Sequence, residues 1–253
     1  TLFRSPGFGA EDFQICQQYD KAGLTHIGVP VPVNAKGVMT DERYNGQFYA
    51  KGNDIVVADL EAEGFLVAKE NITHSYPHCW RCKHPIIYRA TEQWFCSVDA
   101  IKDAAVKACD SIQWKPEWGK ERMTSMITER NDWCISRQLW WGHRIPAYYC
   151  DDCGEISVSA TPLTVCPKCG KPVRQDEDTL DTWFSSALWP FSTLGWPEET
   201  EDLKYFYPTN TLVTGYDIIT FWVSRMIFSG LTYTDKAPFD TVLIHGLVRD
   251  AQG

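Results

Sequence analysis

The chain has 253 residues, of which 44% are hydrophobic and 13% aromatic, enough for one large domain or two small ones with real cores. No run of about eighteen apolar residues occurs, and the N-terminus has neither a basic lead nor an apolar signal core, so we expect no membrane span, no export signal and a cytoplasmic protein. The formal net charge of −9 argues against broad nucleic-acid binding, because phosphate contacts need clustered Lys and Arg.

The first part of the chain, residues 6–74, mixes short β-rich pieces with Gly and Pro breaks. One helical run, NDIVVADLEAEG, has Asn53 as a plausible N-cap and Gly64 as its stop. This texture predicts a small α+β or barrel-like part.

The next parts of the chain differ in composition and pattern. Residues 75–146 are dense in Trp, His and Arg around a helix expected near Asp99–Cys109, and residues 147–175 contain paired cysteines. In residues 176–253 a helix-like aromatic run, DIITFWVSRMIFSGL, precedes the expected strand DTVLIHGLV. This order is typical of a βα unit in a parallel sheet.

The paired cysteines, YCDDCG and VCPKCG, have the spacing of metal knuckles. Zinc is filled by four thiolates in a tetrahedron, and a Gly after each second Cys allows the turn with positive φ that lets backbone N–H groups approach sulfur. Four thiolates leave no position open for water, so the spacing predicts a structural zinc at Cys150, Cys153, Cys166 and Cys169. Reduced cysteines in a loop that has lost its metal remain the alternative.

A second pair, Cys79 and Cys82, has no obvious partner pair in the chain. Completion by Cys96, Cys134, His74 or His78 is one possibility. The other is an incomplete half-site that waits for residues outside the chain, or no site at all.

Five blocks in order resemble the middle of a class I aminoacyl-tRNA synthetase of the isoleucyl/valyl group, and the resemblance runs from about Pro6 to Gly253. The blocks are HSYPHCWRCKHPIIYRATEQWF, ERNDWCISRQLWWGHRIP, DEDTLDTWFSSALWPFSTLGWP, LVTGYDIITFWVSRMI and IHGLVRDAQG. The resemblance implies an α/β fold that combines part of an editing domain (6–74, α+β and barrel-like), a connecting segment re-entering the catalytic domain (75–146), a zinc ribbon (147–175) and the second half of a Rossmann-like catalytic domain (176–253).

The two halves resemble different members of the group. The sequence from PGFGAEDF to DWCISRQ is similar to that of isoleucyl enzymes, and the sequence from LWWGHRIP onward is similar to that of valyl enzymes. A chimeric join near Asp132–Gln138 would explain this, and so would one ancestral-looking synthetase that mixes both patterns. The predicted function is therefore part of an enzyme that activates a branched aliphatic amino acid, valine favoured and isoleucine the alternative.

The ends of the chain depart from the family. Residues 1–5, TLFRS, match nothing in it and resemble adaptor sequence, and neither the His-Ile-Gly-His nor the Lys-Met-Ser-Lys-Ser motif occurs. His26-Ile27-Gly28 is followed by Val29 and lies in the editing part. We therefore expect an internal fragment that is inactive alone, with no complete catalytic set.

Residue roles follow from the resemblance. Asp12 occupies the place of the editing acid that holds the ammonium of a mischarged amino acid, although it is also readable as a surface acid near a turn. Editing is needed because a pocket separates amino acids that differ by one methylene by only about 1–3 kcal/mol. Asp217 resembles the acid that meets the amino acid's ammonium or the adenylate ribose at the mouth of a sheet.

The remaining catalytic-half residues divide into two sets. Trp183, Ile218 and Trp222 resemble walls of an aliphatic pocket, with Ile218 and Trp222 four apart and so able to share a helical face. Gly215, His245 and Gly246 resemble contacts to the ATP adenosine. Each could instead be an ordinary core residue.

The resemblance also implies the partners: tRNA, a branched aliphatic amino acid and ATP with Mg²⁺, with structural zinc, no membrane, and a monomeric full enzyme. A zinc-ribbon RNA-binding module without catalysis is a different class of function. It would need a basic face, yet residues 147–175 carry Lys168, Lys171 and Arg174 against Asp151, Asp152 and Glu155. A metal-dependent hydrolase would need an open coordination position, which four Cys do not leave.

Overall fold

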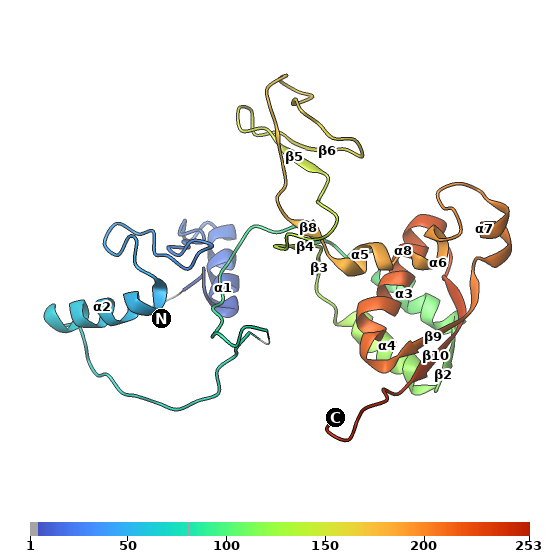
Figure 1. Ribbon diagram of the computed structural model, residues 1–253, viewed down its shortest axis with the longest axis horizontal. Coiled ribbons are helices and arrows are strands. Elements are labelled where there is room, and N and C mark those ends of the chain that lie inside the picture. The colour runs from blue at the N-terminus through green and yellow to red at the C-terminus, as the bar shows by residue number, and fades with distance from the viewer. Residues whose placement is uncertain (1–4, 80) are drawn as a thin grey trace. The chain divides into compact units, whose positions relative to one another are not determined.

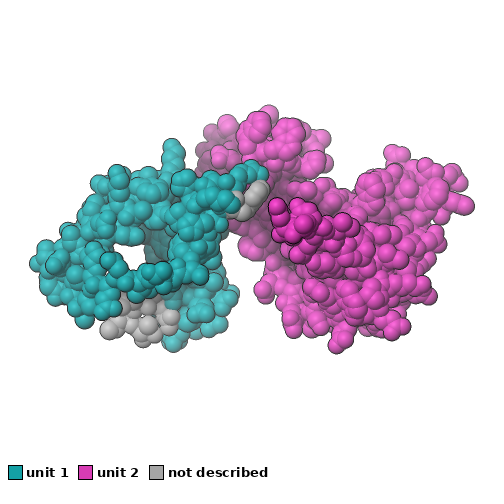
Figure 2. All heavy atoms as spheres, turned by 60° about the horizontal axis from the view of Figure 1, so that its bottom comes forward, with its two compact units in different colours: residues 1–92 teal, residues 93–253 magenta. Residues whose placement is uncertain are grey.

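The computed structural model describes residues 5–79 and 81–253, and the chain divides into two compact units, residues 1–92 and 93–253 (Figure 2). Apart from Ser5, the expected adaptor segment 1–5 lies outside the described residues. The segment 75–146, expected as one connection, is divided between the two units at Glu92 and Gln93. No helix in the described ranges combines the length and the apolar character needed to cross a bilayer.

The described residues of the first unit form two helices and no strands, although short strands were expected. It contains α1 (Ala10–Lys21) and α2 (Tyr49–Ala62), and between residues 6 and 74 its described backbone pairs only through single bridges, Val33 with Met39 and Val38 with Phe48. The barrel-like arrangement is therefore not formed. Pro30 and Pro32 account for part of this, because alternate residues of a strand face the same edge and both prolines lack an N–H to donate there.

Helix α2 begins earlier than the sequence suggests. Its N-cap is Phe48, and the N–H of Gly52 already donates to the Phe48 carbonyl at 2.9 Å, so Asn53 lies inside the helix and caps nothing. Gly64 follows the C-cap with φ of 77°, the left-handed conformation that ends many helices, which confirms the predicted stop.

The second unit holds the remaining helices and strands (Figure 1). Its helices are α3 (Asp99–Ser111), α4 (Trp118–Thr128), α5 (Thr182–Ser186), α6 (Trp189–Ser192), α7 (Glu201–Phe206) and α8 (Ser224–Thr234). Its strands are β1 (Phe95–Cys96), β2 (Gln113–Lys115), β3 (Trp133–Cys134), β4 (Ser136–Arg137), β5 (Ala147–Tyr149), β6 (Ile156–Val158), β7 (Arg174–Gln175), β8 (Thr179–Leu180), β9 (Thr209–Gly215) and β10 (Phe239–His245).

A parallel three-stranded sheet, ordered β2-β10-β9, forms the centre of the second unit. The predicted helix near Asp99–Cys109 is α3, whose Ala105, Ala108 and Cys109 share a buried face at helical spacing. Figure 1 shows α3, α4 and α8 gathered beside the sheet. The core consists of their buried side chains and those of the sheet, among them Met123, Ile127, Met226, Ile227 and Val242.

The expected helix after β9 is regular only in its second half. Tyr216–Ile218 form a 3₁₀ turn, Ile219–Val223 a π-helical turn, and the α-helix begins at Ser224. Two carbonyls in this stretch accept side-chain donors: Thr220 from Arg130 Nη1 at 3.0 Å and Phe221 from Arg225 Nη1 at 3.2 Å. Such inserted donors compete with the α-helical ladder, which explains the departure.

Three small antiparallel sheets complete the second unit: β1-β3, β4-β8 and β6-β5-β7. The last of these lies within residues 147–175 and supports the paired cysteines. Asp176, directly after β7, accepts the indole N–H of Trp94 at 2.7 Å and the hydroxyl of Tyr149 at 2.6 Å. One carboxylate therefore connects β5 of the cysteine segment to Trp94, the residue before β1.

Candidate functional site

The four cysteines of residues 150–169 form two turns with the same backbone geometry. In each turn the first Cys N–H donates to the carbonyl five residues on, Cys150 to Glu155 at 2.9 Å and Cys166 to Lys171 at 2.7 Å. The Gly four residues on returns a bond of 2.9 Å to the first Cys in both turns. Gly154 and Gly170 have φ of 70° and 71°, so the positive φ predicted for these glycines is confirmed.

The two turns bring their sulfur atoms together. Cys150 Sγ lies 3.4 Å from Cys169 Sγ and Cys153 Sγ lies 3.7 Å from Cys166 Sγ, and all four atoms are within 4.8 Å of one another. A tetrahedron with metal–sulfur bonds of about 2.3 Å has edges of about 3.8 Å. The four cysteines could therefore hold a metal ion with little movement.

Backbone donors prepare one of these thiols for ligation. The N–H of Cys169 lowers the pKa of the Cys166 thiol to about 7 against the opposing effect of burial, and the N–H of Lys168, 3.4 Å from Cys166 Sγ, acts in the same direction. Thiolate is the form that binds metal, so Cys166 is the thiol most ready to ligate. Against the effect of backbone donors, burial and the neighbouring cysteines raise the pKa of the Cys153 thiol and that of Cys169, the latter to about 12.

Cys79 and Cys82 form a third turn of this kind in the first unit. The Cys79 N–H donates to the His84 carbonyl at 2.8 Å, and the Lys83 N–H returns a bond of 2.8 Å to Cys79. Lys83 takes φ of 61° where the other turns have glycine. Among the described residues no further ligand gathers around this pair, because the one group of three or more candidate metal ligands is the set of four cysteines.

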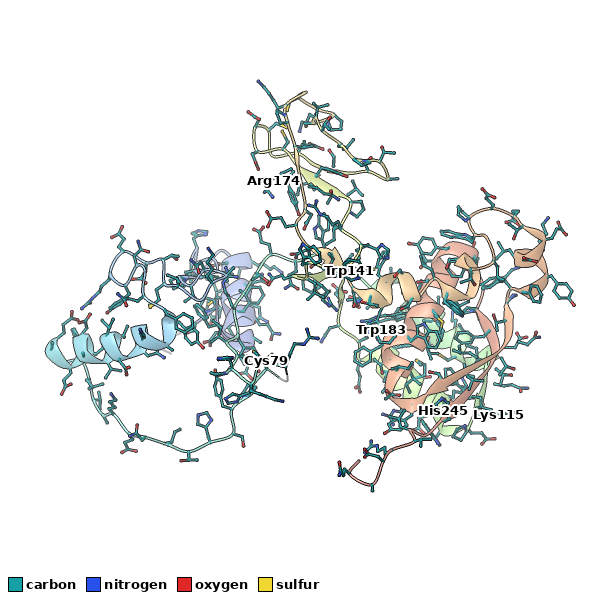
Figure 3. The ribbon with its side chains drawn as sticks, viewed as in Figure 1. Cys79, Lys115, Trp141, Arg174, Trp183 and His245 are labelled. Carbon is teal, nitrogen blue, oxygen red and sulfur yellow. The ribbon has the colours of Figure 1, made fainter. Side chains whose placement is uncertain are left out.

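The expected adenosine and ammonium contacts meet at the carboxyl edge of the parallel sheet. Gly215 ends β9 and pairs in register with His245, which ends β10 and is labelled in Figure 3. Gly246 follows His245. A Cβ on Gly215 would lie 2.6 Å from Asp217 Oδ1 and 3.7 Å from His245 Cε1, so glycine leaves room for both side chains. Asp217 and His245 are exposed. This edge is where ligands bind in open α/β sheets.

The three residues expected to form pocket walls lie in three different elements: Trp183 in α5, Ile218 in the 3₁₀ turn and Trp222 in the π-helical turn. Trp183 of α5 is half-buried and stacks on Phe221 with ring centroids 6.0 Å apart. Trp222 donates its indole N–H to the Ser186 carbonyl at 3.0 Å and packs against the core. Ile218 ends the 3₁₀ turn, so the single α-helical face expected for Ile218 and Trp222 does not exist.

Asp12 lies in the first unit, in the first turn of α1, and its Oδ2 accepts the N–H of Ser5 at 2.8 Å. A negative charge is favourable at a helix N-terminus, so the residue has a local structural role whatever else it does.

Two buried carboxylates were not predicted from the sequence. Asp176 and Asp181, at opposite ends of the short strand β8, each accept a tryptophan N–H, from Trp94 and Trp133 respectively. Arg225, which is 5% exposed and pairs with Asp181 at 3.3 Å, was also missed. Its position inside the apolar run FWVSRMIF was the available signal, because a charge at such a position must find a buried partner.

Comparison with known proteins places these features in context. The family model of tRNA synthetases class I (I, L, M and V) matches residues 17–168 and 168–253. A valine–tRNA ligase of Symbiobacterium thermophilum is 50% identical over 98% of this chain, and one of Thermotoga maritima is 47% identical over 98%. The chain spans 28% and 29% of the length of these two relatives.

Among solved structures, a methionyl-tRNA synthetase of Mycobacterium tuberculosis bound by methionyl-adenylate aligns with a TM-score of 0.45 and 13% identity, over 95% of this chain and 44% of that one.

Proposed function

The chain belongs to the class I tRNA synthetases of the isoleucine, leucine, methionine and valine group, and on that premise we propose that it is part of a valine–tRNA ligase. In this role it would help to activate valine with ATP and Mg²⁺ and to transfer it to tRNA. The observation that carries the proposal is the identity of 50% and 47%, over 98% of the chain, with two relatives of that name. These matches span both halves of the chain and favour valine over the isoleucine alternative.

The carboxyl edge of the sheet would bind the adenylate. The exposed carboxylate of Asp217 can accept hydrogen bonds from an ammonium group or from ribose hydroxyls, and it lies beside His245 across Gly215. His245 and Gly246 would contact the adenosine. The chemistry is an in-line attack on the α-phosphate, in which the protein mainly positions the reactants and stabilises charge.

Trp183, Ile218 and Trp222 would form walls of the pocket for the amino-acid side chain. Two indoles and an Ile side chain would leave a narrow apolar space, which would suit a short β-branched side chain. The fixed indole of Trp222, bonded to the Ser186 carbonyl, supports its use as a rigid wall.

The metal at the four cysteines would be zinc, and its role would be structural. Two Cys-x-x-Cys turns with sulfur–sulfur distances near a tetrahedral edge support a complete four-thiolate site, which has no position for a reacting water. Cys79 and Cys82 would supply half of a second site, whose other ligands would come from elsewhere in the full enzyme.

The first unit would belong to the editing part, with Asp12 holding the ammonium of a mischarged amino acid. A second, hydrolytic sieve is needed because pocket walls alone discriminate one methylene by about 1–3 kcal/mol. The proposed domains are 6–74 for editing, 75–146 for the segment that connects it to the catalytic part and re-enters that part, 147–175 for the ribbon and 176–253 for the rest of the catalytic part. The re-entry is supported by β2, which pairs with β10.

The experiment places residues 6–253 in the frame of the Symbiobacterium thermophilum relative, in exchange for its matching segment, and measures valine-dependent ATP–pyrophosphate exchange. We expect exchange well above a blank without valine, and we expect none from the 253-residue chain alone, because it contains neither ATP signature motif. A folded replacement enzyme without valine-dependent exchange would contradict the proposal.

A further inference from the structure

Asp181 does not use its carboxylate to cap the helix that it precedes. It is the N-cap residue of α5, yet no side-chain cap bond forms there. Instead its Oδ2 accepts the indole N–H of Trp133 at 2.9 Å and lies 3.1 Å from Arg137 Nη2 and 3.3 Å from Arg225 Nη1. Its backbone is fixed as well, because its N–H donates to the Ile135 carbonyl at 2.7 Å.

Arg225 connects this carboxylate to the π-helical turn. Its Nη1 also donates to the carbonyl of Phe221 at 3.2 Å, and its guanidinium lies 4.1 Å from the centroid of the Trp133 ring. Burial, with Arg130 nearby, lowers the pKa of Arg225 to about 10, so the group remains charged at neutral pH. Its Nε is buried without a hydrogen-bond partner in the described part of the chain. A buried charge so placed depends on its carboxylate partner.

Asp181 and Arg225 are each linked to one member of an aromatic pair, Trp183 and Phe221. Trp183 lies two residues after Asp181, and Phe221 carries the carbonyl that Arg225 holds. The rings of Trp183 and Phe221 stack at 6.0 Å with an interplanar angle of 22°. The Asp181–Arg225 ion pair thus closes a ring of contacts and chain links that runs through both aromatic residues.

We propose that Asp181 and Arg225 are positioning residues, which hold the Trp183–Phe221 pair in the stacked arrangement that the amino-acid pocket uses. The use of the pair by the pocket rests on the proposed function; the positioning itself does not. Neither residue would touch the reacting atoms. Phe221, which is 47% exposed and stacks on Trp183, would be a further aromatic residue in the wall of the amino-acid pocket.

Fluorine NMR of the 253-residue chain carrying 5-fluorotryptophan tests the proposal. The chain has eleven tryptophans, and the Trp183→Phe variant assigns the Trp183 signal by removing it. Phe221→Leu then gives the Trp183 shift that marks loss of the stack. We expect Asp181→Asn to move the Trp183 signal at least halfway toward that reference, and Asp181→Glu, which keeps the charge, to return it partly.

Asp176→Asn is the matched control, because it also removes a buried carboxylate that binds a tryptophan N–H beside β8 but has no link to Arg225. It should move the Trp94 signal and leave that of Trp183 in place. If the Asp181→Asn chain does not fold, the Trp183 signal of the Arg225→Lys chain tests the proposal instead. Lysine keeps the charge but cannot bridge the Asp181 carboxylate and the Phe221 carbonyl in the same way, so this signal should also move.

An unmoved Trp183 signal in the folded Asp181→Asn or Arg225→Lys chain would overturn the positioning role, and so would an equal movement in Asp176→Asn. The spectra are recorded without substrate, so this failure is distinct from a failure of the proposed function, which the exchange assay detects.

Discussion

Cys150 Sγ and Cys169 Sγ lie 3.4 Å apart, although each cysteine belongs to a different Cys-x-x-Cys turn. The pairing of β5 with both β6 and β7 brings the two turns to the same end of a small antiparallel sheet. The sheet therefore brings together the four cysteines that could hold a metal from parts that are separate in the sequence.

Metal content is the first prediction. Protein purified without metal-binding tags should contain about one equivalent of zinc, and Cys166→Ser should lower it, because a serine hydroxyl is a poor substitute for a thiolate ligand. Metal analysis of the dialysed protein gives the number. Cys96→Ser is the control, because Cys96 is exposed and lies outside the group of four. Zinc content that is equal in the Cys166→Ser variant and the parent would refute the site.

The two Cys-x-x-Cys turns show what a sequence pattern can predict. Cysteine spacing and the following glycines specify a local turn, and α3 and β10 follow from local periodicity, so these features could be predicted and are present. The π-helical turn could not, because Arg130, whose side chain binds the Thr220 carbonyl, is distant in sequence. The same holds for the carboxylates at 176 and 181, because their indole donors, Trp94 and Trp133, are also distant in the sequence.

Asp176 should make stability depend on pH. Burial opposes its ionisation, but the hydrogen bonds from Tyr149 and Trp94 outweigh this effect and hold its pKa below the ordinary value. A lowered carboxyl pKa contributes stability that is present above the ordinary pKa and is lost as pH falls through the lowered one. We expect Asp176→Asn to cost about 1–3 kcal/mol at pH 7 and less below about pH 4, measured by urea unfolding.

Asp178 provides a control of opposite sign. Burial, together with repulsion from Asp176 and Glu177, raises the pKa of its carboxyl, so its ionised form is unfavourable in the folded chain. Asp178→Asn should therefore leave the free energy of unfolding at pH 7 unchanged or increase it. Equal losses in the two variants would show that the bonds to Asp176 are not the cause.

Gly215 should be needed at the sheet edge. In the replacement enzyme we expect Gly215→Ala to raise KM for valine about tenfold, which corresponds to about 1.4 kcal/mol, because the new Cβ would displace the Asp217 carboxylate. Val213→Ala is the control, since Val213 lies on the same strand with an exposed side chain. Steady-state exchange kinetics at varied valine give both values. A KM for Gly215→Ala that matches the control would place Asp217 outside the valine site.

Trp222 should contribute to the exclusion of isoleucine. In the same replacement enzyme, Trp222→Leu should reduce the preference for valine over isoleucine, because a wall against the extra methylene would be gone, and that methylene is worth about 1–3 kcal/mol. Trp189→Leu, which shortens an exposed tryptophan, is the control and should leave the preference unchanged. An unchanged preference in Trp222→Leu would remove this indole from the pocket.

We propose that this chain carries the amino-acid pocket of a valine enzyme, and one ratio measures the preference of that pocket. It is kcat/KM for valine divided by kcat/KM for isoleucine, measured by ATP–pyrophosphate exchange in the replacement enzyme that carries residues 6–253. We expect this ratio to be well above one, because a pocket walled by two indoles and Ile218 would favour the shorter side chain. A replacement enzyme that prefers isoleucine would contradict the claim.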